Sequence, residues 1–560
     1  MMRSALAWFA VLGGCSQAPD GTEPPAPPDP KGWTLAIDMS GLDRFVQPAD
    51  ATSWMVGGTV TASEGLANVA VAGMDLGATS PFAAPVPVMP GLTRVPVLAS
   101  DLAGHARKGD RTLLATRLLP DGAHDPLAAS LVLDNATLAA MSGGLAGQAG
   151  TIDVAGEILS RPVLSQDDRC TTWPTAASQD QVTVELVQDS GDLWLHVQVP
   201  NLDVQFAGEC QGVLQTIPLA GEMAGTIDIW SQLAPEPTAG APCLTAFAHT
   251  APEVSVLGWQ FDVWGTGGPL QAWIVSLFRD QKSQEARAQL ASETGARADM
   301  LLADKLAHTS VFDTTSQLDL LGRPLALHLC LADLKKTGTK LVARVAAAAS
   351  GAGAGPHAAP GAPQIDGAAP AVAAHELLLD ANLVGGLLYA AWRDGGLVRP
   401  GPDVDIGALE ALIPGLYDRH PNATSAQVTI DAELPPLVRA GSGDTDLTVE
   451  LGDVMVDVCV EGERILRFGV LLSLSLSLEP QAGKLVPHVV DATAQVALLD
   501  ELLDGPDEAL EQAVQLQLGS AAASLLGDGA AIALPALPGL GPPTDVLPAS
   551  GGRFVRVKLR

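Results

Sequence analysis

The sequence predicts a mainly β fold with long amphipathic helices, an α+β chain of 560 residues. Short alternating apolar runs, separated by Gly, Pro, Asn and Asp turns, occupy residues 33–119 and are typical of a β-sandwich. Longer alternating runs follow, and LLSLSLSLEP is the clearest, because its leucines share one face of a strand and its serines the other. Helical patterns cover about 269–308 and 507–526. Pro506 suits the start of the second helix, and Gly527 suits its end.

The first 14 residues predict a signal peptide that is removed on export. Arg3 precedes an apolar run that is well short of the ~20 residues needed to cross a bilayer. The run ends in LGGC, which resembles the bacterial lipobox, in which the thiol of the cysteine receives a diacylglycerol. Cleavage before Cys15 frees an amine that takes a further acyl chain such as palmitate, and several chains together give stable anchoring. The alternative is an ordinary secretory signal with an incidental cysteine.

Residues 15–32 are rich in Pro, Asp and Gly, and we expect them to form an acylated tether without a core of its own. Ser16 after Cys15 favours the outer membrane of a bacterial cell envelope as the place of the anchor.

The composition narrows the set of partners. The formal net charge is −32, which argues against nucleic acid and against electrostatic docking to anionic lipid. The mean hydropathy is +0.24, which is high for a chain without a later apolar run of membrane-spanning length. We therefore expect the apolar residues to form cores or the lining of a binding site. The membrane is expected as a partner through the acylated Cys15, and the oligomeric state is left open.

Cysteine spacing predicts disulfides rather than a metal site. Five cysteines follow the lipobox, and none lies in CxxC spacing: Cys170, Cys210, Cys243, Cys330 and Cys459. An exported compartment permits disulfides, and the pairing expected here is Cys170–Cys210 with Cys243–Cys330. Cys459 would then remain as a buried free thiol. No metal and no cofactor are expected, and His124, in a loop-like setting, is expected to be solvated.

Two segments that begin alike indicate a duplication. LVLDNATL at 131–138 and LLLDANL at 377–383 each open a similar succession of alternating strands and a long helix. An Ala/Gly/Pro-rich stretch at 346–371 is expected to link the two units.

Two resemblances follow from these segments. Within 33–119, the pattern PGLTRVPVLASDLAGHARKG resembles bacterial Ig-like modules, and this implies an Ig-like β-sandwich that acts as a spacer or adhesive unit. The region 126–560 resembles the TULIP superfamily of lipid-binding proteins, of the two-barrel kind typified by bactericidal/permeability-increasing protein and cholesteryl ester transfer protein. The motifs are LVLDNATLAAMSGGL, LLLDANLVGGLLYAAWRDGGL, ELPPLV and ALPALPGL. The basic tips of the antibacterial members are absent from this acidic chain.

The second resemblance implies two TULIP-like units, at 126–345 and 372–560, each a curved sheet around a long helix with an apolar tunnel. Its expected lipid-lining residues are Leu131, Leu133, Leu138, Trp273, Leu277, Leu301, Leu388, Trp392, Leu474 and Leu476. The ligand is then a lipid or another amphiphile, which the protein binds and transfers.

The sequence shows no nucleophile elbow, phosphate-binding loop, HExxH motif or EF-hand loop, so we expect no enzyme. The chief alternative is a structural or adhesive surface protein built of solid-cored β-domains.

Overall fold

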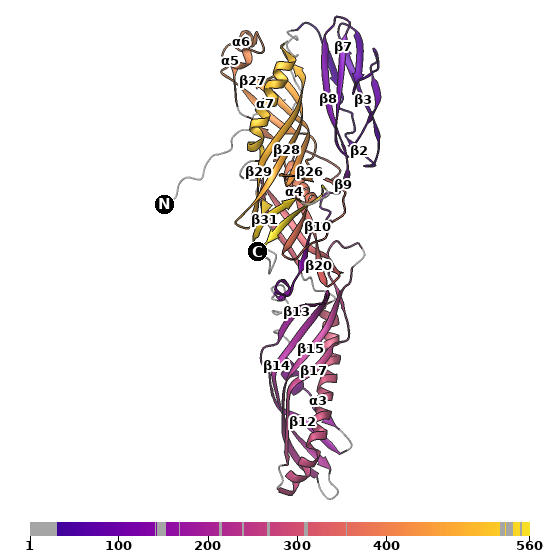
Figure 1. Cartoon of the computed structure of the whole chain (residues 1–560), viewed down its shortest axis with the longest axis vertical. Helices are drawn as coiled ribbons and strands as arrows, with labels where there is room; N and C mark the ends of the chain where they lie inside the picture. The colour runs from indigo at the N-terminus through magenta and orange to yellow at the C-terminus, as the bar shows by residue number, and fades with distance from the viewer. Residues whose placement is uncertain are drawn as a thin grey trace, which may run out of the picture.

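The computed structural model describes residues 31–139, 142, 153–166, 169–211, 216–237, 240–265, 269–306, 312–353, 355–401, 403–503, 505–526, 532–533, 541–548 and 552–560. The molecule is elongated, with the N-terminal strands beside the C-terminal unit at one end and the longest helix at the other (Figure 1). Within the described part of the chain, no helix is both long enough and apolar enough to cross a membrane. The signal peptide, Cys15 and nearly all of the predicted tether lie outside the described residues.

The N-terminal module consists of two sheets that enclose a core of their own; its strand pairs are antiparallel except β2 with β8, which is parallel. One sheet has the order β1-β3-β6 and the other β2-β8-β7-β4-β5. Side chains of both sheets, such as Val56, Phe82, Val95 and Leu113, meet in one buried cluster. The alternation explains the burial, since Phe82, Ala84 and Val86 of β6 are buried and the residues between them are exposed. The strands are β1 (Leu35–Asp38), β2 (Phe45–Val46), β3 (Ser53–Ala62), β4 (Leu66–Val71), β5 (Met74–Asp75), β6 (Phe82–Pro87), β7 (Gly91–Asp101) and β8 (Ala106–Ala115).

A seven-stranded central sheet joins the two units, in the order β18-β19-β20-β10-β22-β32-β31. Its middle strands, β10 and β22, carry the two similar sequence openings and pair antiparallel, with Leu131 opposite Leu377. The outer neighbours are the closing strands of each unit, β20 beside β10 and β32 beside β22. The strands are β10 (Asp125–Leu133), β18 (Asp313–Leu320), β19 (Arg323–Thr337), β20 (Lys340–Ser350), β22 (Glu376–Asp380), β31 (Pro543–Pro548) and β32 (Phe554–Leu559).

This pairing gives the duplication a pseudo-two-fold axis. Leu131 and Leu377 hold equivalent places in the two openings and lie opposite each other in the ladder. A two-fold axis between them would therefore exchange the two strands. Leu131 and Leu377 are each 4% exposed, so the axis passes through the buried interior. The two units are therefore joined by the strands with which each begins.

Each of the two openings contains an aspartate that caps a helix, Asp134 in the first and Asp380 in the second, but their surroundings differ. Asp134 accepts hydrogen bonds from the backbone N–H and the hydroxyl of Thr137, each at 2.8 Å, and the backbone bond lowers the pKa of Asp134. Asp380 is fully buried; it caps α4 (Ala381–Arg393) and binds Arg553 at 2.6 Å. Burial nevertheless raises the pKa of Asp380 to about 7.

The first unit is a curled sheet in the order β11-β12-β14-β15-β16, with β13 paired to β14 and β17 paired to β15. The 38-residue helix α3 (Pro269–Leu306) runs along β17 (Figure 1). The other elements are α2 (Val154–Leu159), β11 (Ser165–Gln166), β12 (Cys170–Ser178), β13 (Thr183–Asp189), β14 (Asp192–Gln211), β15 (Thr216–Pro235), β16 (Phe247–His249) and β17 (Glu253–Gly265).

The second unit repeats this plan with the sheet order β23-β25-β27-β28-β29-β30, with β24 paired to β25 and β26 to β27, and with helix α7 (Asp507–Leu526) against β29. Its other elements are α5 (Ile406–Glu410), α6 (Leu416–Arg419), β23 (Arg399–Pro400), β24 (Val404–Asp405), β25 (Ser425–Ala432), β26 (Leu437–Ala440), β27 (Leu447–Val460), β28 (Glu463–Gln481), β29 (Lys484–Glu501) and β30 (Ile532–Ala533).

The predicted linker at 346–371 differs from the structure. Residues 346–350 belong to β20, and Ala346 is fully buried. Further on, β21 (Ala362–Gln364) is buried and pairs with β9 (Arg117–Leu119). Small alanine side chains fit between packed layers, and strand pairing is a long-range contact that composition does not reveal. One apolar core extends through both units and the central sheet, so the units are not separately packed domains.

The N-terminal module packs along the side of the second unit, through contacts of β8 with β27, β28 and β29 (Figure 1). The cations of this interface come from the module and the carboxylates from the second unit. Arg44 lies 2.7 Å from Glu433 and 2.9 Å from Asp453. Lys108 lies 2.8 Å from Glu511. The module is thus held against the second unit by charge complementarity.

Two disulfides lie in the described part of the chain, Cys170–Cys210 and Cys243–Cys330. They are the two pairs expected from the sequence. The first joins directly opposite residues of β12 and β14, and the second fastens the segment before β16 to β19. The expectation of a free thiol at Cys459 is wrong, because Cys459 is disulfide-bonded as well.

Candidate functional site

The apolar residues of β17 that face α3 keep part of their surface accessible. On the core-facing side of β17, Val256 is 2% exposed, and four other apolar residues pack against the core: Val254, Trp259, Phe261 and Val263. These four side chains are half-buried, although they pack against core residues. We call them, together with half-buried Leu290, Ala298 and Leu302 of α3, the α3–β17 apolar face.

Helix α3 covers this face incompletely. A helix that closes a core buries one stripe of its side chains. In α3, each side chain described from Arg279 to Asp304 is half-buried or exposed, whereas Leu306 at the end of the helix is 5% exposed. The described part of α3 therefore leaves these apolar side chains of β17 only partly covered.

Aromatic rings line this apolar face. Phe261 stacks on Phe206 of β14, with ring centroids 5.7 Å apart, and on Trp259, with centroids 6.1 Å apart. Phe206 is 4% exposed and continues into the buried core. The rings thus connect the accessible face to the packed interior of the curled sheet.

Polar contacts hold the helix in place over the strand. The indole N–H of Trp259 donates to the hydroxyl of Ser283 at 2.8 Å, and the Arg287 guanidinium donates to the carbonyl of Val256 at 2.7 Å. These two hydrogen bonds hold the middle of α3 against β17. The arrangement is suited to an apolar or amphipathic ligand.

Seven of the ten lining residues predicted from the sequence lie in the packed core. Trp392 and Leu474 are 0% exposed, and none of the seven exceeds 5%. The seven are Leu131, Leu133, Leu138, Leu388, Trp392, Leu474 and Leu476.

The other three predicted lining residues, Trp273, Leu277 and Leu301, lie on α3, but their side chains are outside the described part of the structure. The lining role of all ten stays a prediction. The sequence does not distinguish β17 from a fully packed strand, because both kinds of strand show the same alternation of side chains.

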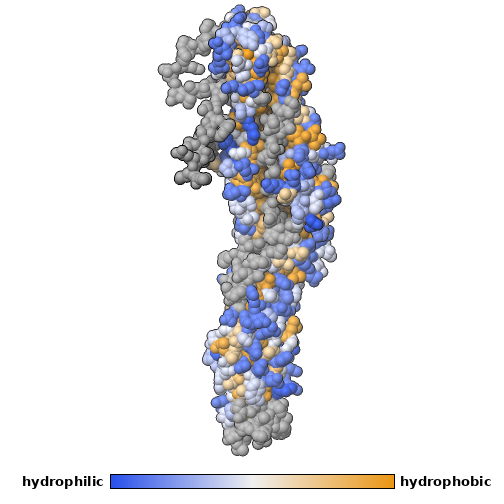
Figure 2. Space-filling view, turned by 90° about the vertical axis from the view of Figure 1, so that its left-hand side faces the viewer, coloured by the Kyte–Doolittle hydropathy of each residue, from blue (hydrophilic) through white to orange (hydrophobic). Residues whose placement is uncertain are grey.

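A hollow of about 400 Å³ lies between the N-terminal module and the second unit. Leu98 and Lys108 line it from the module, and Val496 and Glu511 from β29 and α7. The Lys108–Glu511 ion pair at 2.8 Å crosses this interface. Figure 2 shows that the surface facing the viewer carries small apolar patches among hydrophilic residues along the length of the molecule.

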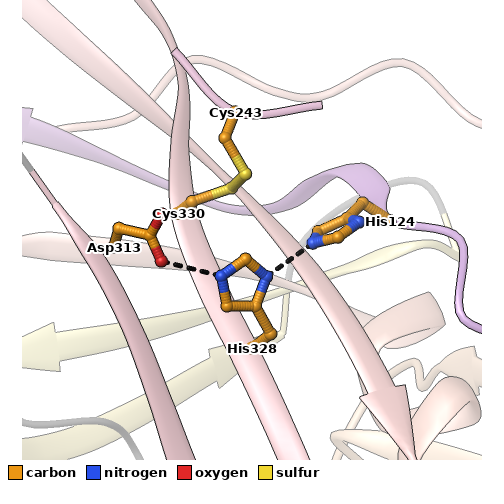
Figure 3. The surroundings of a disulfide bond; sticks show 5 residues. All are labelled: His124, Cys243, Asp313, His328 and Cys330. Atoms are coloured by element: carbon orange, nitrogen blue, oxygen red, sulfur yellow. Dashed lines mark hydrogen bonds and ion pairs between the residues drawn. A yellow bond between two sulfur atoms is a disulfide. The ribbon is translucent and has the colours of Figure 1, made fainter. Parts of the chain in front are cut away.

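A cluster of metal-ligating side chains surrounds the Cys243–Cys330 disulfide (Figure 3). One ligand atom from each of His124, Cys243, His328 and Cys330 lies within 4.8 Å of the others. Nε2 of His124 is 2.7 Å from Nδ1 of His328, so His124 is not the isolated, solvated side chain expected from the sequence. The sequence offered one signal, His328 and Cys330 at i and i+2 on one face of a strand.

Comparison with known proteins yields a weak structural likeness. No protein-family model matches the chain. No curated protein sequence matches it either. The fold is similar to the crystal structure of a lipopolysaccharide binding protein, with 12% sequence identity, 79% of this chain and 99% of that chain covered, and a TM-score of 0.38. At this level the likeness carries no conclusion about what this chain binds.

Proposed function

We propose that the chain binds a lipid or another amphiphile, with the acyl chain lying on the α3–β17 apolar face. The observation that carries this proposal is the incomplete burial of Val254, Trp259, Phe261 and Val263 beneath a long helix. Water-accessible apolar surface in a protein interior is unfavourable unless a ligand covers it. No catalytic group is needed, and the proposed function is binding without chemistry.

The energetics suit a long acyl chain. Burial of a methylene group stabilises by about 0.8 kcal/mol, so a 16-carbon chain gains on the order of 10 kcal/mol before ordering is counted. The headgroup remains at the edge of the face, where Asp262 and Arg279 are exposed. A neutral or zwitterionic headgroup fits the strongly acidic chain better than an anionic one, given the net charge of −32.

The finer parts of the proposal are a TULIP-like pair of units, an Ig-like module and an envelope lipoprotein anchored by acylated Cys15. The duplicated openings paired on a pseudo-two-fold axis support the tandem units. The lipobox-like LGGC supports the anchor, and the anchor with Ser16 supports the outer membrane. Anchoring would keep the apolar face close to a lipid source, from which transfer could proceed.

The test uses the full chain with Cys15→Ala, so that covalent acyl groups do not confuse the measurement. We expect lipid to co-purify without detergent, as detected by mass spectrometry, and a fluorescent fatty acid to bind. Phe261→Gln with Val263→Gln should weaken probe binding at least tenfold. The matched control is Leu257→Gln, which removes an apolar side chain from the outer, 47% exposed face of the same strand. Absence of both lipid and probe binding, or an equal loss in the control, would contradict the proposal.

The second candidate is a structural or adhesive surface protein with solid β-cores. The observation that favours it is the complete burial of Leu474 and Trp392 in the second unit. This candidate predicts no bound lipid and no response of the probe to Phe261→Gln. It also predicts binding to a protein or polysaccharide through an outer face.

A further inference from the structure

The Cys243–Cys330 disulfide lies among groups that could coordinate a metal once the disulfide is reduced. The four side chains come from three separate segments: the turn before β10 supplies His124, the segment between β15 and β16 supplies Cys243, and β19 supplies His328 and Cys330. The Cα atoms of the two cysteines are 5.5 Å apart, which allows both sulfurs to face one ion. Backbone contact also fixes the segment, because the N–H of Leu244 donates to the carbonyl of Leu331 at 2.6 Å.

A carboxylate already orients one of the histidines as metal sites require. Asp313 Oδ1 lies 2.7 Å from Nε2 of His328 (Figure 3). Because a carboxylate only accepts, Nε2 of His328 carries the proton and Nδ1 presents its lone pair toward His124. Carboxylate–histidine pairs of this kind hold the ring of a zinc ligand in place.

We propose that the reduced form of this cluster binds one zinc ion, with His124, Cys243, His328 and Cys330 as its ligands. Two thiolates and two imidazoles are the donor set that Zn²⁺ takes in tetrahedral structural sites. Tetrahedral zinc needs ligand atoms about 3.3–3.8 Å apart, given Zn–N and Zn–S bonds of about 2.0 and 2.3 Å. The four ligand atoms lie within 4.8 Å of one another, so adjustments of side chains suffice. The proposal is independent of the amphiphile-binding function.

The redox step needs a dithiol reductant. The S–S bond breaks as the dithiol is oxidised to its own disulfide, and two electrons and two protons pass to Cys243 and Cys330. Zinc then displaces both thiol protons, while His124 and His328 bind as neutral imidazoles, His124 carrying its proton on Nδ1. The net change is reduction of one disulfide, binding of one Zn²⁺ and release of two protons. The disulfide and the zinc ion are thus alternative cross-links between β19 and the segment that carries Cys243.

The experiment compares zinc affinity in the oxidised and reduced full-length chain, with Zn²⁺ alone, a phosphine reductant and a chromophoric chelator as competitor. We expect one equivalent to bind the reduced chain, and at least 100-fold weaker binding to the oxidised chain. Cobalt(II) in place of zinc should show the absorption of a tetrahedral thiolate complex. Equal affinity in both redox states, or no binding after reduction, would overturn the proposal.

The variants separate this site from adventitious thiol binding. His328→Ala should weaken zinc binding to the reduced chain at least 100-fold, and Asp313→Asn should weaken it 10–100-fold. The controls are Cys170→Ser with Cys210→Ser, which removes the other disulfide, and His488→Ala at an exposed site; both should leave the affinity unchanged. Loss of binding in a control, or full binding by His328→Ala, contradicts the assignment. Near-UV circular dichroism checks that each variant is folded, and the wild-type cobalt spectrum decides independently of any variant.

Discussion

Replacement of Arg44 by methionine should loosen the N-terminal module from the second unit. Arg44 Nη1 lies 2.9 Å from Asp453, whose side chain is only 3% exposed. Asp453 also accepts the backbone N–H of Thr112 at 2.6 Å, so β8 and β27 are joined through this one carboxylate. Burial raises the pKa of Asp453, and Arg44 opposes that rise. Without Arg44 the carboxylate is left buried and incompletely compensated.

The magnitude follows from the burial of the pair. Removal of one partner of a buried ion pair destabilises by about 3–5 kcal/mol. Arg44 is 25% exposed, so we expect the lower end, about 3 kcal/mol. Since 1.36 kcal/mol is a factor of ten, local opening at this interface should become about 150-fold more frequent.

Hydrogen exchange read by mass spectrometry measures that opening directly, in peptides that cover β8 and β27. We expect faster exchange there and unchanged exchange in β17, which belongs to the first unit. Arg44→Met with Asp453→Asn should recover much of the protection, because removal of both charges leaves no buried ion. The control is Lys558→Met, whose pair with Asp545 is about half exposed and contributes about 0.5 kcal/mol at most. An Arg44 variant whose exchange rises less than fivefold would refute the reasoning.

Three further predictions concern stability. The folded-state pKa of Asp380 is raised from 3.8 to about 7, so its contribution is fully present below pH 4 and is lost as the pH rises through 7. Asp380→Asn should therefore remove up to about 4 kcal/mol of that pH dependence, as measured by urea unfolding at pH 4 and pH 8, and an unchanged pH profile would contradict the raised pKa. Leu474→Ala should destabilise by about 2–5 kcal/mol in urea without a change in fatty-acid probe binding, and altered probe binding would instead place Leu474 in the lining. Loss of the Cys170–Cys210 disulfide, with its sequence separation of 40, should lower the free energy of unfolding by about 4 kcal/mol, and a loss under 1 kcal/mol would show that the open chain is already restrained.

Alternation and helix-end signals in the sequence predicted the strand β28 and the helix α7, because both signals depend only on neighbouring residues. The alternation in β28 places Leu472, Leu474, Leu476 and Leu478 on one face, and all four are buried. The helix predicted at 507–526 coincides with α7, where Pro506 stands just before the helix and Gly527 follows it. Proline fixes the first turn and glycine relieves the last, so both signals act within a few residues.

Long-range features could not be predicted in the same way. The pairing of Leu131 with Leu377 needs both openings to be brought together, which no local pattern states. The contact between His124 and His328 likewise depends on the path of the chain between them. The half-buried state of Phe261 depends on how far α3 stands from β17, and the same alternation in β28 gives a fully buried face. A period of two specifies which side chains share a face, but it leaves open what covers that face.

The two units cover their corresponding strands in similar ways. In the second unit, the inner face of β28 is closed by its neighbours, with Leu474 at 0% and Leu476 at 3% exposure. In the first unit, the inner face of β15 is closed too, with Ile227 at 0% and Ile229 at 5% exposure. The strands that face the long helices are less buried in both units: Phe261 and Val263 of β17 against α3, and Val489 and Val496 of β29 against α7, are half-buried. Among the described residues, the N-terminal module packs against β27, β28 and β29 of the second unit. Since the N-terminal module lies against β29 and α7, whereas β17 and α3 carry no such described contact, we propose the first unit rather than the second as the place of the ligand.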